Sequence, residues 1–241
     1  TWTSADLTHY VNEAIKAGQD SISFLIRGSD DTGANRLWMA DNDWKNGARL
    51  ILDYTVEPPA QNAPVVADTY VSQTEPDANY SGEADMHLIS DTENNATKWV
   101  YLKYDISTAY QEIISATLHV YGAIHNTATD LSSLNIGVYK VDNIDWLEDT
   151  VTWNGKPSAG DMLASAVIVE NKYYDISSAA LSEYVNEAIK AEKDSIAFAI
   201  KATENTPGNR GWISGMNYKP SHLILNYEPQ AQAPIVLPAG G

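Results

Sequence analysis

Hydrophobic residues recur at helical spacing in two stretches of the chain. In TSADLTHYVNEAIKAG (residues 3–18), the apolar positions fall on one face of a helix: Leu7, Tyr10, Val11, Ala14 and Ile15. Thr3 and Asp6 have the spacing of a capping box, and Gly18 suits the C-terminal cap. The pattern returns at Leu181, Tyr184, Val185, Ala188 and Ile189. The spacing therefore predicts two short amphipathic helices.

Most other apolar residues lie in short runs that alternate with polar residues or are rich in β-branched side chains, which is typical of strands. These runs are ADTYVSQ (67–73), KWVYLKYDI (98–106), SATLHVYGAI (115–124), LNIGVYKV (134–141), TVTW (150–153), SIAFAI (195–200) and HLILNY (222–227). Gly, Asn, Asp and Pro separate them. We expect an all-β protein: a jelly-roll-like antiparallel β-sandwich with one short helix per module, covering an open end or edge.

The chain contains an internal repeat. YVNEAIKA occurs at residues 10–17 and 184–191, and DSISFLIRG (20–28) corresponds to DSIAFAIKA (194–202). Over a hundred residues precede the second copy and have no counterpart before the first. This pattern predicts an incomplete C-terminal third of a module, a Pro-rich linker, a complete module, and a second linker or tail: residues 1–57, 58–66, 67–228 and 229–241.

An incomplete module would leave strand edges without partners. We therefore expect that residues 1–57 can take part in head-to-tail or strand-exchanged assembly with neighbouring copies of the chain.

Several motifs of the second module resemble the DNRLRE domain, a family also classed as carbohydrate-binding module family 96. These motifs are ADTYV (67–71), PDANYSG (76–82), KWVYLKYDIS (98–107), SATLHVY (115–121) and WLEDTVTWNGKPSAG (146–160). The resemblance implies a non-catalytic β-sandwich found in tandem in secreted or cell-surface proteins of bacteria and archaea. It leaves two functions open: a polysaccharide-binding module, or a structural or adhesive repeat of a fibre or surface layer without a sugar ligand.

The acidic composition bears on the choice of partner. The chain has 32 acidic and 15 basic residues, a formal charge of -17 and no cysteine. Such a field repels nucleic acid, and no apolar run is long enough to insert into a membrane. It also disfavours strongly anionic polysaccharides, unless a local cluster of lysines and arginines or a bridging calcium reverses it. Alginate, whose binding the resemblance implies for some members, is one of these polysaccharides. A neutral glycan or a structural role is therefore favoured.

Aromatic residues in polar surroundings are the candidate glycan contacts, because a sugar ring packs its C–H face on an aromatic plane. Trp44 and Tyr218 lie in loop sequence, and Trp99 begins a strand. Lys98, Lys103 and Arg210 are candidate polar contacts. Four other tryptophans are expected to pack in the core, with the indole N–H of Trp146 and Trp153 bonded to carbonyls: Trp38, Trp146, Trp153 and Trp212.

Metal and catalytic chemistry have little support in the sequence. Asp41, Asp43 and Asp68 could belong to a structural calcium site, although no complete calcium-binding loop is present. The histidines show no metal-ligand spacing, and there is no G-x-S-x-G motif. The sequence therefore predicts that the protein is not an enzyme.

Overall fold

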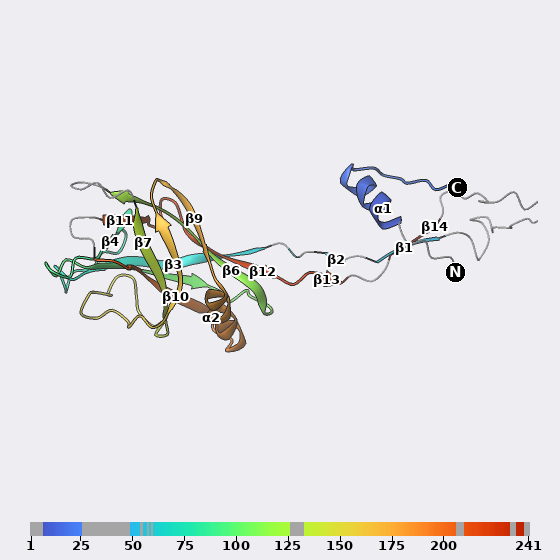
Figure 1. Ribbon diagram of the computed structural model, residues 1–241. Helices are drawn as coiled ribbons and strands as arrows, with labels where there is room; N and C mark the ends of the chain where they lie inside the picture. Colours follow the sequence, from blue (N-terminus) through green and yellow to red (C-terminus); the bar gives the residue numbers. More distant parts are fainter. Residues whose placement is uncertain are drawn as a thin grey trace, which may run out of the picture. The chain divides into compact units, whose positions relative to one another are not determined.

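The computed structural model describes residues 7–25, 49–53, 55–56, 58, 60–125, 133–205, 210–231 and 235–238. The chain divides into two compact units (Figure 1). One unit consists of Thr1–Leu52 and Ile235–Gly241, and the other of Asp53–Pro234. No described helix is long and apolar enough to cross a membrane.

The smaller unit contains the first predicted helix, α1 (Leu7–Lys16), whose Gly18 has φ +64° and caps its end as expected. The predicted capping residues before it lie outside the described residues. Strand β1 (Arg49–Leu52) pairs antiparallel with β14 (Ile235–Pro238).

The larger unit holds ten strands in one antiparallel sheet system, which confirms the predicted β-sandwich class. They are β3 (Gln61–Ser72), β4 (Asp85–Ile89), β5 (Lys98–Asp105), β6 (Ile113–His125), β7 (Leu134–Val141), β8 (Met162–Ile168), β9 (Lys172–Ser177), β10 (Ser195–Ala202), β11 (Arg210–Ser214) and β12 (His222–Tyr227). The order is β3-β12-β6-β11-β4-β5-β10-β7-β8, with β9 beside β6 and a further pairing of β3 with β5. Strands β2 (Thr55–Val56) and β13 (Gln230–Ala231) form a separate short pair.

Strand β3 pairs with two different strands of this sheet system, β12 and β5. Residues 61–64 pair with β12. Residues 65–72 pair with β5, with a register shift between Val65 and Ala67. The strand thus begins at Gln61, inside the segment expected to be a linker.

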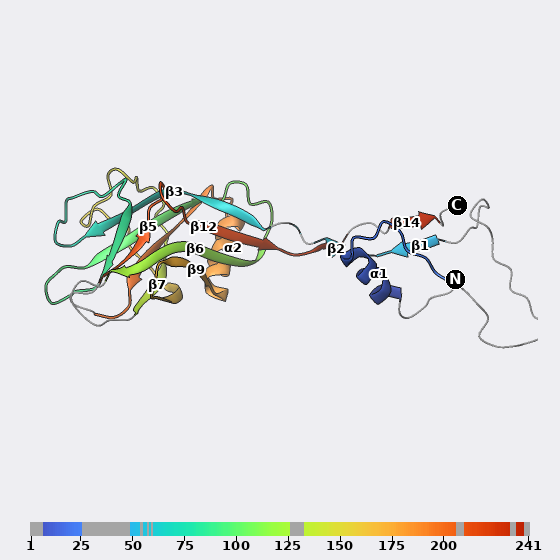
Figure 2. The same ribbon diagram turned by 90° about the horizontal axis from the view of Figure 1, so that it is seen from above.

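The second predicted helix, α2 (Ala179–Lys190), lies against β6, β8 and β10 (Figure 2). Its buried side chains include Leu181 and Val185, and the Tyr184 hydroxyl donates to the Val141 carbonyl at 2.9 Å. The Ser178 side chain caps its first turn by accepting from the Leu181 N–H. The amphipathic pattern therefore has the expected result, because the apolar face of the helix packs on the sheet.

Replacing Glu192 with glycine should stabilise the protein by about 1 kcal/mol. Glu192 ends α2 at φ +50°, and its N–H and that of Lys193 bond to the Ile189 and Ala188 carbonyls. Gly18 holds the equivalent position after α1, and glycine adopts positive φ without the Cβ penalty. Chemical denaturation measures the gain; Glu192→Ala is the control, and an equal gain with alanine would contradict this explanation.

Segment 142–161 covers the outer side of strands β3, β5, β10 and β7. A second apolar cluster forms there, apart from the main core: Ala67, Val71, Tyr101, Val141, Trp146, Val151, Ala197 and Ala199. The Tyr101 hydroxyl donates to the Pro157 carbonyl at 2.8 Å, and the Asn79 amide donates to the carbonyls of Glu148 and Val151, both at 2.8 Å. The prediction of a strand at 150–153 is wrong, because these residues belong to turns and extended chain in the covering segment.

Candidate functional site

A group of aromatic and lysine side chains, here called the Trp99 patch, lies on the outer side of β5, β7 and β10. Its members are Trp99, Tyr139, Trp153, Lys156 and Lys201. The ring centroids of Trp99 and Trp153 are 5.2 Å apart at an interplanar angle of 56°. Lys156 Nζ is 3.7 Å from the Trp153 centroid, and Lys201 Nζ is 3.5 Å from the Tyr139 centroid and 4.7 Å from that of Trp99. All five side chains are half-buried.

The pleat of β5 explains how the patch is built. Successive side chains of a strand point to opposite faces. Val100 and Leu102 therefore enter the main core, while Trp99 and Tyr101 contact the outer cluster. Tyr139 on β7 contacts that same cluster, and the covering segment adds Trp153 and Lys156. The site thus combines residues from three strands and one long connection.

The lysines of this surface are partly desolvated cations. Burial lowers the pKa of Lys103, Lys156 and Lys201. Lys156 Nζ donates to the Trp153 carbonyl at 2.8 Å, and Lys103 Nζ to the Trp146 carbonyl at 2.7 Å. Among the described residues, none of the three forms an ion pair with a carboxylate. Since an ammonium group has three donors, hydrogen-bonding capacity remains for a ligand.

A groove of about 580 Å³ lies on the same outer side. Lys103 Nζ is 4.5 Å from the Trp146 ring centroid in its wall. The other lining residues are Val66, Ala67, Ser81, Gly82, Leu147, Glu148 and Asp149. The groove therefore offers both an ammonium group and carboxylates beside the lysine-rich patch.

The structure separates the predicted glycan contacts. Trp99 belongs to the patch, and Lys103 shares its side of β5 with Trp99. Lys98 points the other way, with Nζ 5.1 Å from the Tyr70 ring centroid. Burial lowers the pKa of Lys98, and the charge of Arg210 lowers it further, so these two cations lie near each other. They do not join the Trp99 patch.

The two remaining aromatic predictions are also apart from the patch. Tyr218 is 70% exposed on the loop after β11. Trp44 lies outside the described residues, as does Trp38.

Trp153 and Trp146 differ from the sequence-based expectation. Trp153 is half-exposed and places its ring against Trp99, so it is a member of the patch. Trp146 is buried as expected, but its Nε1 has no hydrogen-bond partner among the residues that the structure describes, contrary to the prediction. No sequence pattern predicts that Tyr139 or Lys201 belongs to this patch. For Trp153 and Lys156, the signal is that both lie in the motif at residues 146–160.

The calcium prediction rests on three aspartates. Asp41 and Asp43 lie outside the described residues. Asp68 is 5% exposed, and its Oδ2 accepts the Met216 N–H at 2.6 Å. Burial raises the pKa of Asp68 to about 6, against the opposing effect of this hydrogen bond. The described residues contain no group of three His, Cys, Asp or Glu side chains suited to a metal, so calcium binding stays a prediction.

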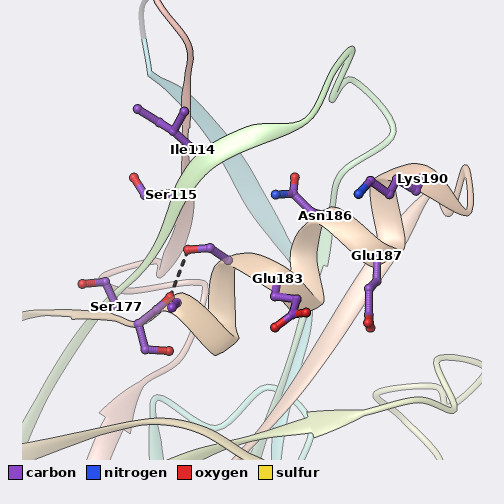
Figure 3. A pocket seen from close by; sticks show the side chains of 10 residues that line it. Ile114, Ser115, Ser177, Glu183, Asn186, Glu187 and Lys190 are labelled. Carbon is purple, nitrogen blue, oxygen red and sulfur yellow. Dashed lines mark hydrogen bonds between the residues drawn. The ribbon is translucent and has the colours of Figure 1, made fainter.

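A second pocket, of about 590 Å³, lies between α2 and β6 (Figure 3). It is rich in hydroxyl groups: Ser115, Ser177, Ser178 and Ser182. However, Ser182 and Asn186 already bond to the backbone of β6 at Ala116 and Ile113. Within the described parts of the chain, no aromatic side chain lines this pocket, so those residues give a sugar ring no surface on which to stack.

Residues 59–225 match carbohydrate-binding module family 96. A gellan lyase from a Bacillus species is 25% identical over 136 residues, which are 55% of this chain and 5% of the lyase. The chain therefore spans only a small part of that relative.

Two solved structures show low similarity. The CBM22–GH10 modules of a Clostridium thermocellum endo-1,4-β-D-xylanase, complexed with xylohexaose, align with a TM-score of 0.28 at 11% identity over 76% of this chain and 30% of that one. An adhesin domain of Lys-gingipain from Porphyromonas gingivalis aligns with a TM-score of 0.29 at 9% identity over 76% of this chain and 99% of that one. The assignment rests on the family match, which covers more than half of the sequence: the chain belongs to carbohydrate-binding module family 96.

Proposed function

We propose that the module binds a polysaccharide at the Trp99 patch. The observation that carries this proposal is the pair of half-exposed indole rings, 5.2 Å apart, with two lysine ammonium groups against the patch rings. An indole plane accepts the C–H face of a pyranose, and ammonium donors suit its oxygens. Membership of a carbohydrate-binding family supports this use of the site.

The lysines favour an acidic polysaccharide over a neutral one. Lys103, Lys156 and Lys201 lie on one side of the sheet, and none has a carboxylate ion-pair partner among the described residues. Lys156 and Lys201 give this side of the sheet a local positive charge, whereas Lys103 interacts with Asp145 and shares its groove with Glu148 and Asp149. A local positive charge is the condition under which an acidic chain of net charge -17 can still attract an anionic glycan. The Bacillus relative is named for its action on the polysaccharide gellan, which is therefore one ligand to test.

We place this polysaccharide binding in an extracellular protein that consists of tandem modules. The repeat of YVNEAIKA at residues 10–17 and 184–191 supports a tandem arrangement. Linked modules with individually weak sites gain avidity on a polymer that repeats the same ligand. The module itself contributes binding and not catalysis, as its family membership implies.

Replacing Trp99 with alanine tests the proposal. The full chain is run by affinity electrophoresis through gels containing gellan, polygalacturonate or xylan, and calorimetry measures the affinity for any ligand that retards it. We expect Trp99→Ala to weaken binding to the acidic ligand by about tenfold or more, since a buried aromatic anchor contributes on the order of 2 kcal/mol. Tyr110→Ala, which removes an exposed ring stacked on Tyr227, is the control.

Two results would contradict the proposal. Unchanged affinity of Trp99→Ala would mean that the ligand binds elsewhere. If the unaltered chain binds none of these polysaccharides and elutes as a polymer in size-exclusion chromatography, the structural repeat of a fibre or surface layer is the better account.

A further inference from the structure

A second aromatic surface, here called the Tyr173 face, crosses the outer side of β9, β6, β12 and β11. Its rings are His119, Tyr121, Tyr173, Trp212 and His222. His119 and Tyr173 stack with centroids 4.4 Å apart at 9°, and Tyr121 lies 5.0 Å from Tyr173 and 6.0 Å from Trp212. His222 continues the row 6.4 Å from His119 at 15°. The contacts therefore form one continuous series across four strands.

Strand register brings these rings together. β6 pairs with β9 on one side and β12 on the other, so Tyr121 is opposite Tyr173 and His119 is opposite His222. The alternate residues Leu118 and Val120 enter the main core. Trp99, on β5, also points away from this core, because its neighbour Val100 enters it. The Tyr173 face and the Trp99 patch thus lie on opposite sides of the core.

The rings of the Tyr173 face remain accessible to a ligand. Tyr173 is 41% exposed, and Tyr121, His119, His222 and Trp212 are each half-buried. Cross-strand aromatic pairs also stabilise sheets, so a single pair would need no other explanation. A row of five partly exposed rings exceeds what two-residue pairing requires. His119 already stacks on one plane of Tyr173, whereas Trp212 is tilted by 45° to Tyr121 at 6.0 Å, so the indole offers a plane on which a pyranose ring can stack.

The charges against the Tyr173 face differ from those of the Trp99 patch. Asp175 Oδ1 is 2.5 Å from His119 Nδ1, and Lys219 Nζ is 3.6 Å from the Tyr121 centroid. A carboxylate only accepts, so Nδ1 of His119 donates to Asp175. The carboxylate and the ammonium group offset each other, and Arg210, two residues before Trp212 on β11, adds one half-buried guanidinium at the end of the row. This small net charge matches an uncharged chain better than a polyanion.

We propose that the Tyr173 face is a second carbohydrate-binding site, and that its ligand is a neutral polysaccharide chain lying across the strands. The site is distinct from the one proposed above for acidic glycans, although it rests on the same idea that the module binds carbohydrate. Stacking on Trp212 and on the exposed part of Tyr173 provides the affinity, and Asp175, Lys219 and Nε2 of His119 bond to the sugar hydroxyls. The module would then hold two different chains at once.

Affinity electrophoresis of the full chain through xylan, hydroxyethylcellulose and galactomannan tests this site. Tyr173→Ala and Trp212→Ala should each weaken retention on the neutral polysaccharide that binds best, by about tenfold, and leave retention on gellan or polygalacturonate unchanged. Trp99→Ala should do the reverse. Tyr173→Phe keeps the ring and should retain binding, and thermal denaturation checks that each variant is folded.

Two outcomes would overturn the inference. One is that none of the neutral polysaccharides retards the unaltered chain, which would leave the Trp99 proposal intact. The other is that a neutral polysaccharide retards the folded Tyr173→Ala and Trp212→Ala variants as strongly as the unaltered chain. If Trp99→Ala alone then abolishes binding to every ligand, a single site serves them all.

Discussion

Replacing Lys156 and Lys201 together with methionine is expected to weaken binding to an acidic polysaccharide by about tenfold to a hundredfold. The two ammonium groups lie against the rings of the Trp99 patch, and burial already lowers their pKa. Each of these partly solvated charge contacts contributes on the order of 1 kcal/mol, and methionine preserves much of the apolar stem. The loss should appear in calorimetric titrations at low salt, where the charge contribution is largest.

Salt dependence separates this charge effect from a loss of packing. Binding of the unaltered chain should weaken as salt increases, and the double variant should show a much flatter dependence. Lys140→Met is the matched control, because Lys140 Nζ lies 3.8 Å from an Asp142 carboxylate oxygen and 3.7 Å from one of Asp161. An equal loss of affinity in this control, or an unchanged salt dependence in the double variant, would refute the role of the two lysines.

Between acidic and neutral pH, the stability of Asp68→Asn relative to the unaltered protein should change by up to about 3 kcal/mol. Burial raises the pKa of Asp68 from 3.8 in the unfolded chain to about 6 in the folded protein. The stability contributed by this carboxyl is therefore full below pH 3.8 and is lost as pH rises through about 6. Asparagine stays neutral and can still accept the Met216 N–H, so the variant should gain stability relative to the unaltered protein as pH rises.

Chemical denaturation of the unaltered protein and of Asp68→Asn measures the difference in stability. It is carried out at several pH values between 3.8 and about 6, and at higher pH. Asp68→Ala is the informative control, because it removes the hydrogen bond to the Met216 N–H as well as the charge. Alanine should destabilise at acidic pH, where asparagine and the protonated aspartic acid both keep that bond. A pH-independent difference between Asp68→Asn and the unaltered protein would show that the carboxyl does not titrate as the buried environment requires.

Local pattern predicted both helices, six of the strands and the fold class, but the predicted runs do not include β4, β8, β9 or β11. The apolar spacing of residues 181–189 corresponds to the buried face of α2, and the alternating run at 98–106 corresponds to β5. The run at 150–153 alternates equally well but is not a strand. Its backbone belongs to the segment held by Asn79, and a side chain so distant in sequence cannot be foreseen from local alternation.

The two proposed binding surfaces, the Trp99 patch and the Tyr173 face, were harder to predict than the fold, because they depend on strand register. The sequence places Lys98 directly beside Trp99, which favours both as contacts of one ligand. However, adjacent residues of a strand point to opposite faces. The true neighbours of Trp99 are Lys201, a hundred residues later, and Trp153, from the covering segment. The rings of the Tyr173 face likewise come from four strands, and no short motif contains them.

Segment 142–161 is attached to the sandwich through the buried side chains of Trp146 and Val151 and through hydrogen bonds to its own backbone. Tyr101 and Asn79 bond to the carbonyl oxygens of Pro157, Glu148 and Val151, and none of these bonds involves the side chains at those positions. Exposed positions of the segment can therefore be substituted while its attachment is kept. Because Trp153 and Lys156 project from this segment into the Trp99 patch, ligand preference can be redesigned, or can diverge among relatives, without rebuilding the scaffold.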